Sequence, residues 1–355
     1  MKFIINRQLP LVFRRRVLSS NLLYGKISPD SSVFIELSIT LANRNGVLSY
    51  IVPDSLIGRS NFEDTRRMII SDSKIHKWLH INNVFDSANV ASLIYVCKKA
   101  NGEMYSFLYQ KTSDVISWQK GSYSTVQVSS QQVLENDSCK VIFADESKIQ
   151  VLSYLRRFPT FDSKCVIWRG EEVGKKDEAI LRKPFARCVP ILTGEDVHRY
   201  ELPTPTKWIA KNDILKDVPY GSQKLLIRQL GDSINATIDL NGVASTQSVY
   251  SVLPEDSSQE SLYFYLGILN SKLFDFIYNL VSGDKQTFKR IILENVKALP
   301  LPVNYTIEMR NNLALLVKQR IEAKNGQMSE VENEINDLVF RLYGIPQKMQ
   351  VIIMA

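Results

Sequence analysis

The sequence predicts an open α/β sheet, followed by a mixed, β-rich α+β domain and a helical tail. Residues 31–98 follow the order helix, strand, helix, strand, strand by their apolar spacing. From residue 151 onward, short β-like runs alternate with turn residues, which is typical of a mixed domain. Apolar residues of 306–343 recur at helical spacing, with a break near Gly326. The expected parts are 1–100, a connecting segment 101–150, a second domain 151–305 and a tail 306–355.

The opening helix and strand are predicted from capping residues and an apolar run. Ser31 or Ser32 can cap a helix that continues to about Asn43. Gly46 suits the left-handed position that ends such a helix. The run Val47–Val52 is almost wholly apolar, which favours a strand covered on both faces of its sheet.

A second helix and two further strands complete the predicted sheet. Asn61 is a capping candidate for that helix. Strand-like runs follow at Lys74–Asn82 and Ala91–Lys98. His76 and His80 would share one face of either a helix or the first of these strands, but no H-E-x-x-H pattern accompanies them. A zinc site is therefore a minor alternative to two ordinary strand residues.

The second domain is predicted from short strands, one long helix and a polar connection before them. The connecting segment contains minor strands at 104–109 and 125–128. A single helix is expected from Glu260 to about Leu280. The predicted strands of the domain are Cys165–Arg169, Leu225–Gln229, Asn235–Leu240 and Ser248–Leu253.

Composition indicates a soluble protein of the reducing cytoplasm with a basic surface. The chain has 44 Lys and Arg residues against 37 Asp and Glu residues, a formal charge of +7 that favours a polyanionic partner. Its four cysteines lack C-x-x-C spacing, which indicates free thiols. No apolar run reaches the length that crosses a membrane.

No self-contained active site is recognisable. The sequence has no G-x-G-x-x-G, P-loop, G-x-S-x-G or catalytic Cys/His signature. This pattern argues against a complete nucleotide-dependent enzyme. Pro53, Asp54 and Ser55 follow the first strand, at the carboxyl edge where open α/β sheets bind ligands, although a plain turn fits them equally. Phe85 is either a core aromatic or an aromatic at the rim of the sheet that stacks on a ligand.

Basic residues of the second domain are interleaved with aromatic ones, which suits contact with phosphates, although an ordinary solvated basic face is the alternative. Thr193 and Gly194 are expected to form a turn with exposed N–H groups. The candidate DNA-binding residues are Arg187, Thr193, Gly194, Arg199, Tyr200 and Arg228, with a second group at Lys285, Thr287, Lys289 and Arg290.

Several segments in order resemble the adenine-specific DNA methyltransferases of type II restriction–modification systems that carry a TaqI-like C-terminal specificity domain. The methyltransferase part resembles Gly46–Ser55 and Val84–Ile94. The specificity part resembles Pro190–Asp196 with Arg199-Tyr200, Leu225–Arg228, Ile268–Leu273, Leu299–Pro302 and Ile335–Gly344. The resemblance covers nearly the whole chain and implies that its first part is the C-terminal portion of a Rossmann-like methyltransferase sheet.

The resemblance also implies a chemistry. Such enzymes flip an adenine out of the duplex and methylate its exocyclic amino group with S-adenosyl-L-methionine. The aromatic matching Phe85 packs against the flipped base, and Pro53, Asp54 and Ser55 form the edge of the pocket. The sequence has neither the N-P-P-Y motif nor the cofactor motif of the family. The expectation is therefore an N-terminally truncated or split enzyme that does not bind S-adenosyl-L-methionine alone and is inactive alone.

The sequence thus predicts the DNA-recognition part of a site-specific adenine methyltransferase. Its expected partners are double-stranded DNA and a separately encoded cofactor half or a restriction endonuclease, with no membrane and no metal. One alternative is a stand-alone, non-enzymatic DNA-specificity subunit, although the two long spacer helices of type I subunits are not evident. Another is a non-enzymatic protein with chance similarity.

Overall fold

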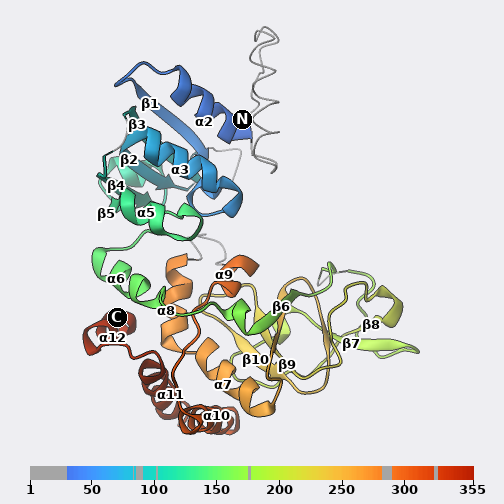
Figure 1. The fold of residues 1–355 in the computed structure, drawn as a ribbon. Coiled ribbons are helices and arrows are strands. Elements are labelled where there is room, and N and C mark those ends of the chain that lie inside the picture. Colours follow the sequence, from blue (N-terminus) through green and yellow to red (C-terminus); the bar gives the residue numbers. More distant parts are fainter. Residues whose placement is uncertain are drawn as a thin grey trace. The chain divides into compact units, whose positions relative to one another are not determined.

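The structure, a computed structural model, describes residues 30–82, 84, 91–100, 103–174, 177–281, 290–323 and 327–355. The chain divides into two compact units, one ending at Asp145 and the other spanning Glu146–Ala355. Figure 1 follows both units along the chain. Among the described residues, no helix is both long and apolar enough to span a bilayer.

The first unit is a five-stranded sheet with helices. In chain order it contains α2 (Asp30–Leu41), β1 (Val47–Pro53), α3 (Glu63–Asp72), β2 (Ser73–Ile81), β3 (Ser92–Lys99), β4 (Ser106–Thr112), α4 (Val115–Gln119), β5 (Ser124–Ser129) and α5 (Ser130–Glu135). The strands lie in the order β1-β3-β2-β4-β5. Because β3 is antiparallel to both β1 and β2, and β4 is parallel to β2, the carboxyl ends of β1, β2 and β4 share one edge.

Aromatic side chains and one buried arginine hold the first unit together. Trp78 and Tyr95 are fully buried on adjacent strands, with ring centroids 5.9 Å apart. Arg66 of α3 is also buried, and it donates hydrogen bonds to the carbonyls of Leu56 at 2.9 Å and Cys139 at 3.0 Å. These bonds fix α3 to two loops, which offsets part of the cost of burying a guanidinium.

The predicted strands of the first sheet are confirmed, but β1 is not covered on both faces. It is an edge strand among the described residues, and its exposure alternates, with Val47 66% and Ile51 42% exposed. The cap predictions were also wrong. α2 begins at Asp30, and Ser32 instead accepts a hydrogen bond from Thr65 at 2.8 Å.

The ends of two helices differ from the sequence prediction for a local reason. Asn45, not Gly46, takes the left-handed conformation, with φ 67°. An added Cβ on Gly46 would lie 2.9 Å from the carbonyl oxygen of Asn43, so close approach accounts for this glycine. A 3₁₀ turn over Ser60–Phe62 precedes α3, and its N-cap residue makes no side-chain capping bond, so Asn61 is not the cap.

The segment expected to connect two domains contributes instead to the first sheet. β4 pairs with β2 and β5 pairs with β4, so two of the five strands come from 101–150. Phe107 and Tyr109 of β4 are buried in the same core as Trp78. Their alternation with polar residues made the segment look like a tether, whereas it reflects a strand with one buried face.

The second unit combines two small sheets with a helical layer. In chain order it contains α6 (Glu146–Leu155), β6 (Cys165–Arg169), β7 (Cys188–Leu192), β8 (Trp208–Ala210), β9 (Lys224–Arg228), β10 (Ala236–Asp239), β11 (Ala244–Ser245), β12 (Val249–Pro254), α7 (Gln259–Leu269), α8 (Lys272–Val281), α9 (Leu293–Lys297), α10 (Ile307–Glu322), α11 (Met328–Leu342) and α12 (Gln347–Met354). The sheet orders are β10-β9-β12-β6 and β11-β7-β8.

The helices of the second unit pack against the four-stranded sheet. Residues of α7, α8, α10 and α11 share one core with β6, β9, β10 and β12. Figure 1 shows β7 and β8 at the end of this unit farthest from α10 and α11. The helical tail expected over 306–355 is present in the described residues as α10, α11 and α12, and these helices pack in a layer.

The single helix expected from Glu260 to Leu280 is two helices. They are interrupted at Asn270 and Ser271, which are both buried. The Asn270 amide accepts from the backbone N–H of Ala236 at 3.0 Å and donates to its carbonyl at 3.0 Å. This exchange ties the break to the first residue of β10, so tertiary contact overrides the helical pattern.

Candidate nucleic-acid interface

The carboxyl edge of the first sheet holds the predicted Pro53-Asp54-Ser55 segment. Pro53 ends β1 opposite Ser92 of β3, and Asp54 opens a 3₁₀ turn over Asp54–Ile57. The backbone N–H of Asp54 donates to the carbonyl of Ala91 at 3.2 Å, and its Oδ2 lies 3.9 Å from His80 Nε2. The segment therefore sits beside the ends of neighbouring strands, as predicted. Its contact with a ligand stays a prediction.

Two other predictions for this edge can be placed only in part. Phe85 lies outside the described residues. His80 is buried, whereas His76 is exposed. A register shift between Ile75 and Lys77 interrupts the regular alternation of β2, so the two histidines do not share an environment. Among the described residues, no group of three or more His, Cys, Asp or Glu side chains is placed to hold a metal.

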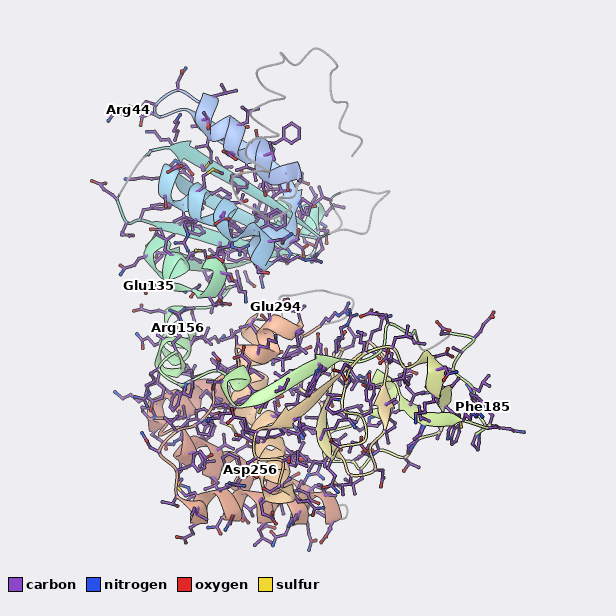
Figure 2. All side chains as sticks on the ribbon, turned by 45° about the vertical axis from the view of Figure 1, so that its right-hand side comes forward. Arg44, Glu135, Arg156, Phe185, Asp256 and Glu294 are labelled. Atoms are coloured by element: carbon purple, nitrogen blue, oxygen red, sulfur yellow. The ribbon has the colours of Figure 1, made fainter. Side chains whose placement is uncertain are left out.

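In the second unit, Arg187 lies at the open end of the β7–β8 pair. It is exposed, has φ 59°, and its carbonyl accepts a hydrogen bond from the N–H of Lys211 at 2.9 Å. Phe185, 38% exposed, is labelled near the far tip of this unit in Figure 2. The predicted mixture of cations and an aromatic is therefore presented to solvent at this tip.

Thr193 and Gly194 do not offer exposed N–H groups. The N–H of Thr193 donates to Asp196 Oδ2 at 2.7 Å, and that of Gly194 donates to Ser248 Oγ at 2.8 Å. Both residues are buried. Burial raises the pKa of Asp196, but hydrogen bonds from Lys207 and Thr193 outweigh it and the pKa is lowered. The turn thus supports the loop that contains Ser248.

Arg199 and Tyr200 are held inside the second unit. Arg199 Nη1 lies 2.9 Å from Asp275 Oδ2, with both side chains mostly buried. Tyr200 is 2% exposed, and the guanidinium of Arg320 lies 5.0 Å from its ring centroid. Their positions favour a packing role, because neither presents its polar group openly to solvent.

Arg228 belongs to an end of the four-stranded sheet where several long polar side chains gather. It ends β9 and pairs with Val249, while Arg169 ends β6 and pairs with Tyr250, the next residue of β12. Its side chain is half-buried, and it makes no ion pair or hydrogen bond within the described part of the chain. Gln229 and Gln247 adjoin the same strand ends.

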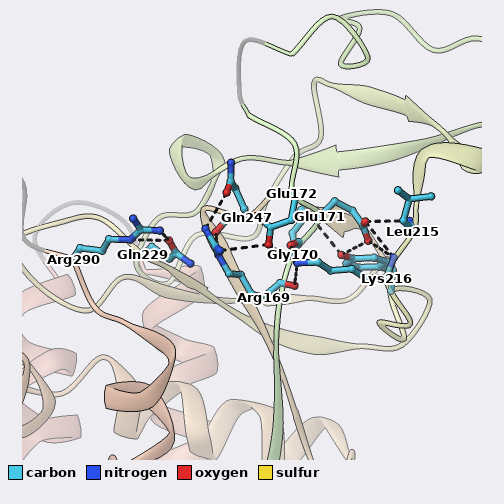
Figure 3. Close-up of polar contacts among 11 residues, drawn as sticks. Arg169, Gly170, Glu171, Glu172, Leu215, Lys216, Gln229, Gln247 and Arg290 are labelled. Atoms are coloured by element: carbon cyan, nitrogen blue, oxygen red, sulfur yellow. Dashed lines mark hydrogen bonds and ion pairs between the residues drawn. The ribbon is translucent and has the colours of Figure 1, made fainter. Parts of the chain in front are cut away.

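Sequence reasoning missed Arg169, Gln229 and Gln247, whereas Arg290 belongs to the second predicted basic group. Arg169 Nη2 donates to Gln247 Oε1 at 2.9 Å, and Arg290 Nη2 donates to Gln229 Oε1 at 2.6 Å (Figure 3). The only signal in the sequence is the position of Arg169 and Gln229 at the ends of predicted strands. We call these four residues the Arg–Gln cluster.

A buried carboxylate orders the loop beside the Arg–Gln cluster. Glu171 is 2% exposed and accepts from the N–H of Leu215 at 3.1 Å and of Lys216 at 3.2 Å, and from the hydroxyl of Tyr220 at 3.1 Å (Figure 3). Because this carboxylate is enclosed by donors, it stabilises the 215–220 loop. Of the second predicted basic group, Lys285, Thr287 and Lys289 lie outside the described residues, and Arg290 is part of the Arg–Gln cluster.

Chemically, the strand ends present guanidinium and amide groups at fixed positions. Such groups bind phosphate oxygens and the edges of bases. The cluster and Arg228 therefore form a surface suited to a polyanion that carries hydrogen-bond acceptors.

Segments of both units match known protein families. Residues 189–301 match the TaqI-like C-terminal specificity domain, and residues 21–85 match the Eco57I restriction-modification methylase family. The resemblance to restriction–modification methyltransferases is confirmed. A candidate type II restriction enzyme and methyltransferase of Methanocaldococcus jannaschii, RM.MjaORFECS2P, is 24% identical over 350 residues. That match covers 89% of this chain and 29% of the relative, so the chain spans less than a third of it.

One solved structure shows a similar fold. The type IIL restriction-modification enzyme MmeI, determined in complex with DNA, is similar with a TM-score of 0.62 and 10% identity, over 96% of this chain and 54% of that one. The type IIG restriction endonuclease BpuSI matches 95% of this chain and 53% of its own, with 12% identity and a TM-score of 0.36. The chain thus spans about half of each of these enzymes.

Proposed function

We propose that this chain is the DNA-recognition part of a site-specific adenine methyltransferase of a restriction–modification system. The observation that carries the proposal is a coincidence of two features. The segment that matches the specificity domain, 189–301, contains Arg228, Gln229, Gln247 and Arg290, which lie together at one end of a sheet. A basic surface with unused hydrogen-bond donors, within such a domain, suits duplex DNA.

The first unit supports a methyltransferase over a recognition protein alone. Its match to a restriction-modification methylase, 21–85, includes β1 and the Pro53-Asp54-Ser55 edge. The exposed Val47 and Ile51 and the outer backbone edge of β1 suit a further strand that completes the sheet. A strand added parallel to β1 would bring its own carboxyl end beside Asp54, where a pocket for a flipped adenine would form.

The described residues of this chain do not fit S-adenosyl-L-methionine. Sheets of this kind hold a nucleoside cofactor with a glycine-rich turn between a strand and a helix. The turn from β1 to α3 has one glycine, Gly58. The connection from β4 to α4 is Ser113-Asp114 and has none. We therefore assign the cofactor to a separate part of the enzyme, and the stand-alone specificity subunit remains the second candidate.

Salt-dependent binding of the purified chain to duplex DNA tests the proposal. We expect the logarithm of the association constant to fall linearly with the logarithm of salt concentration, since phosphate contacts release counterions. Fluorescence anisotropy with a labelled duplex measures it, and heparin serves as a competitor polyanion. Absence of binding, or binding indifferent to salt, would remove DNA recognition from the proposal.

A further inference from the structure

We propose that the Arg–Gln cluster reads guanines, with Arg290–Gln229 and Arg169–Gln247 each contacting the acceptor edge of one guanine in the major groove. The inference rests on the proposed DNA-recognition function and extends it to named base-reading residues and to a base identity. The evidence is which hydrogen-bond donors and acceptors of these four side chains remain unused within the protein.

The Arg290–Gln229 pair has its acceptor occupied and its donors free. Gln229 is 2% exposed, and its Oε1 accepts from Arg290 Nε at 3.1 Å and Nη2 at 2.6 Å. A guanidinium carries only donors, so the amide must turn its oxygen to Arg290 and its NH2 group away. Gln229 Nε2 has no hydrogen-bond partner in the described structure. A buried donor without an acceptor is unfavourable, and a ligand that brings an acceptor would relieve it.

The Arg169–Gln247 pair is also held by two hydrogen bonds, one of them to the backbone of the glutamine. Arg169 Nε donates to the Gln247 carbonyl at 3.0 Å, and Nη2 donates to its side-chain Oε1 at 2.9 Å. The Gln247 amide oxygen is therefore turned to Arg169 with one of its two lone pairs used, and Gln247 Nε2 can only donate. Glu172 lies 3.4 Å from Arg169 Nη1 but is itself exposed and shared with Lys216. N–H groups of Arg169 thus remain for a ligand.

The two pairs are neighbours held by the backbone. The N–H of Gln229 donates to the carbonyl of Ser248 at 3.0 Å, one residue from Gln247, and the N–H of Ile291 donates to the carbonyl of Gln229 at 3.0 Å. Figure 3 shows the two pairs side by side. Residues from four separate chain segments are therefore joined into one array of donors.

The excess of donors in the array favours guanine. Adenine needs both an acceptor for its N6 amino group and a donor for N7. Gln229 Oε1 already accepts two hydrogen bonds, and Gln247 Oε1 is turned to Arg169. Guanine presents two acceptors, O6 and N7, in the major groove. A phosphate would also accept these donors, but each arginine here is fixed at two points by its glutamine, which favours the planar geometry of a base edge.

Selection from a library of short duplexes with a randomised centre tests the inference. The wild-type chain should enrich a motif with guanine at two positions. Gln229→Glu keeps the oxygen that accepts from Arg290 and replaces the NH2 donor with an oxygen, so guanine preference should fall at one position by about 10-fold or more. Gln247→Glu should do the same at the other position. Gln223→Glu, at the opposite end of β9, adds the same charge and is the control, with an unchanged motif.

Replacing each selected guanine by 7-deazaguanine separates bases from phosphates. Wild-type binding should weaken at both positions, and each Glu variant should be insensitive at its own position only, as coupling between contacting groups requires. Duplex binding with no enriched motif, or a motif unchanged in both variants, would overturn guanine reading and leave phosphate contact. If the wild-type chain binds no duplex at all, the proposed function itself would be overturned.

Discussion

The arginines of the second unit differ in what surrounds them, and this decides what each can do. Arg199 pairs with Asp275 of α8, whereas Arg228 ends a strand with no ion pair in the described structure. The sequence placed both in one basic group, because residues 199 and 275 are far apart in the chain. Only the fold brings their charges together. The same applies to the Arg–Gln cluster, whose members come from distant segments.

Replacing Arg228 should therefore affect mainly DNA binding, and replacing Arg199 should affect mainly stability. Arg228→Ala should weaken duplex DNA binding and lower the salt slope by about 1, with little change in stability. Arg199→Ala should lower the free energy of unfolding by about 2 kcal/mol, since it leaves a mostly buried Asp275 without its cation. Anisotropy and denaturant unfolding measure the two quantities. A stable Arg199→Ala chain with weakened DNA binding would return Arg199 to the interface.

At the scale of elements, close backbone approach at the end of β6 positions the Arg–Gln cluster. A Cβ added to Gly170 would lie 2.3 Å from the carbonyl oxygen of Ser245 and 2.4 Å from that of Thr246. Strand β6 can therefore end against this segment only with a glycine at 170. Arg169 directly precedes Gly170, and Gln247 directly follows Thr246. The close contact between Gly170 and Thr246 therefore sets the distance between Arg169 and Gln247.

Gly170→Ala should separate these segments. We expect a loss of about 3 kcal/mol in stability, because the clash is with backbone atoms that cannot move independently. Gly174→Ala is the matched control, since an added Cβ there meets nothing within 4 Å, and it should change stability by less than about 0.5 kcal/mol. Denaturation midpoints followed by circular dichroism compare the two. Equal midpoints would mean that β6 can shift without cost.

Elements were more predictable from the sequence than the interface was. Strand β1 and the other main strands follow from apolar runs, and their prediction is confirmed. The exposure of β1 was not predictable, because an edge strand and a buried strand can share the same apolar residues. The turn at Thr193 and Gly194 was interpreted as open, since the sequence does not reveal that Asp196 and Ser248 accept its N–H groups.

For the whole molecule, the chain contains a sheet whose β1 is an edge strand among the described residues, and a candidate recognition surface in the second unit. β1 has an outer edge with exposed Val47 and Ile51, and the second unit contains the Arg–Gln cluster. The chain spans less than a third of its curated relative. Under the proposed function, a strand from a separate part of the enzyme completes the sheet beside β1. DNA recognition and methyl transfer are then separable, because the proposal gives DNA contact to the Arg–Gln cluster and the cofactor to a separate part of the enzyme.

This separation predicts a split in activity. The purified chain, mixed with S-adenosyl-L-methionine that carries a labelled methyl group and with a duplex it selects, should bind the DNA and transfer no label. Supplying a polypeptide with N-P-P-Y and a glycine-rich motif from a matching enzyme should start transfer to adenine N6, since its strand beside β1 completes the pocket at Asp54. Scintillation counting and mass spectrometry of the nucleosides measure this. Methyl transfer by the chain alone would show that its own residues hold the cofactor, and DNA binding that supports no transfer with any such polypeptide would favour a stand-alone specificity subunit.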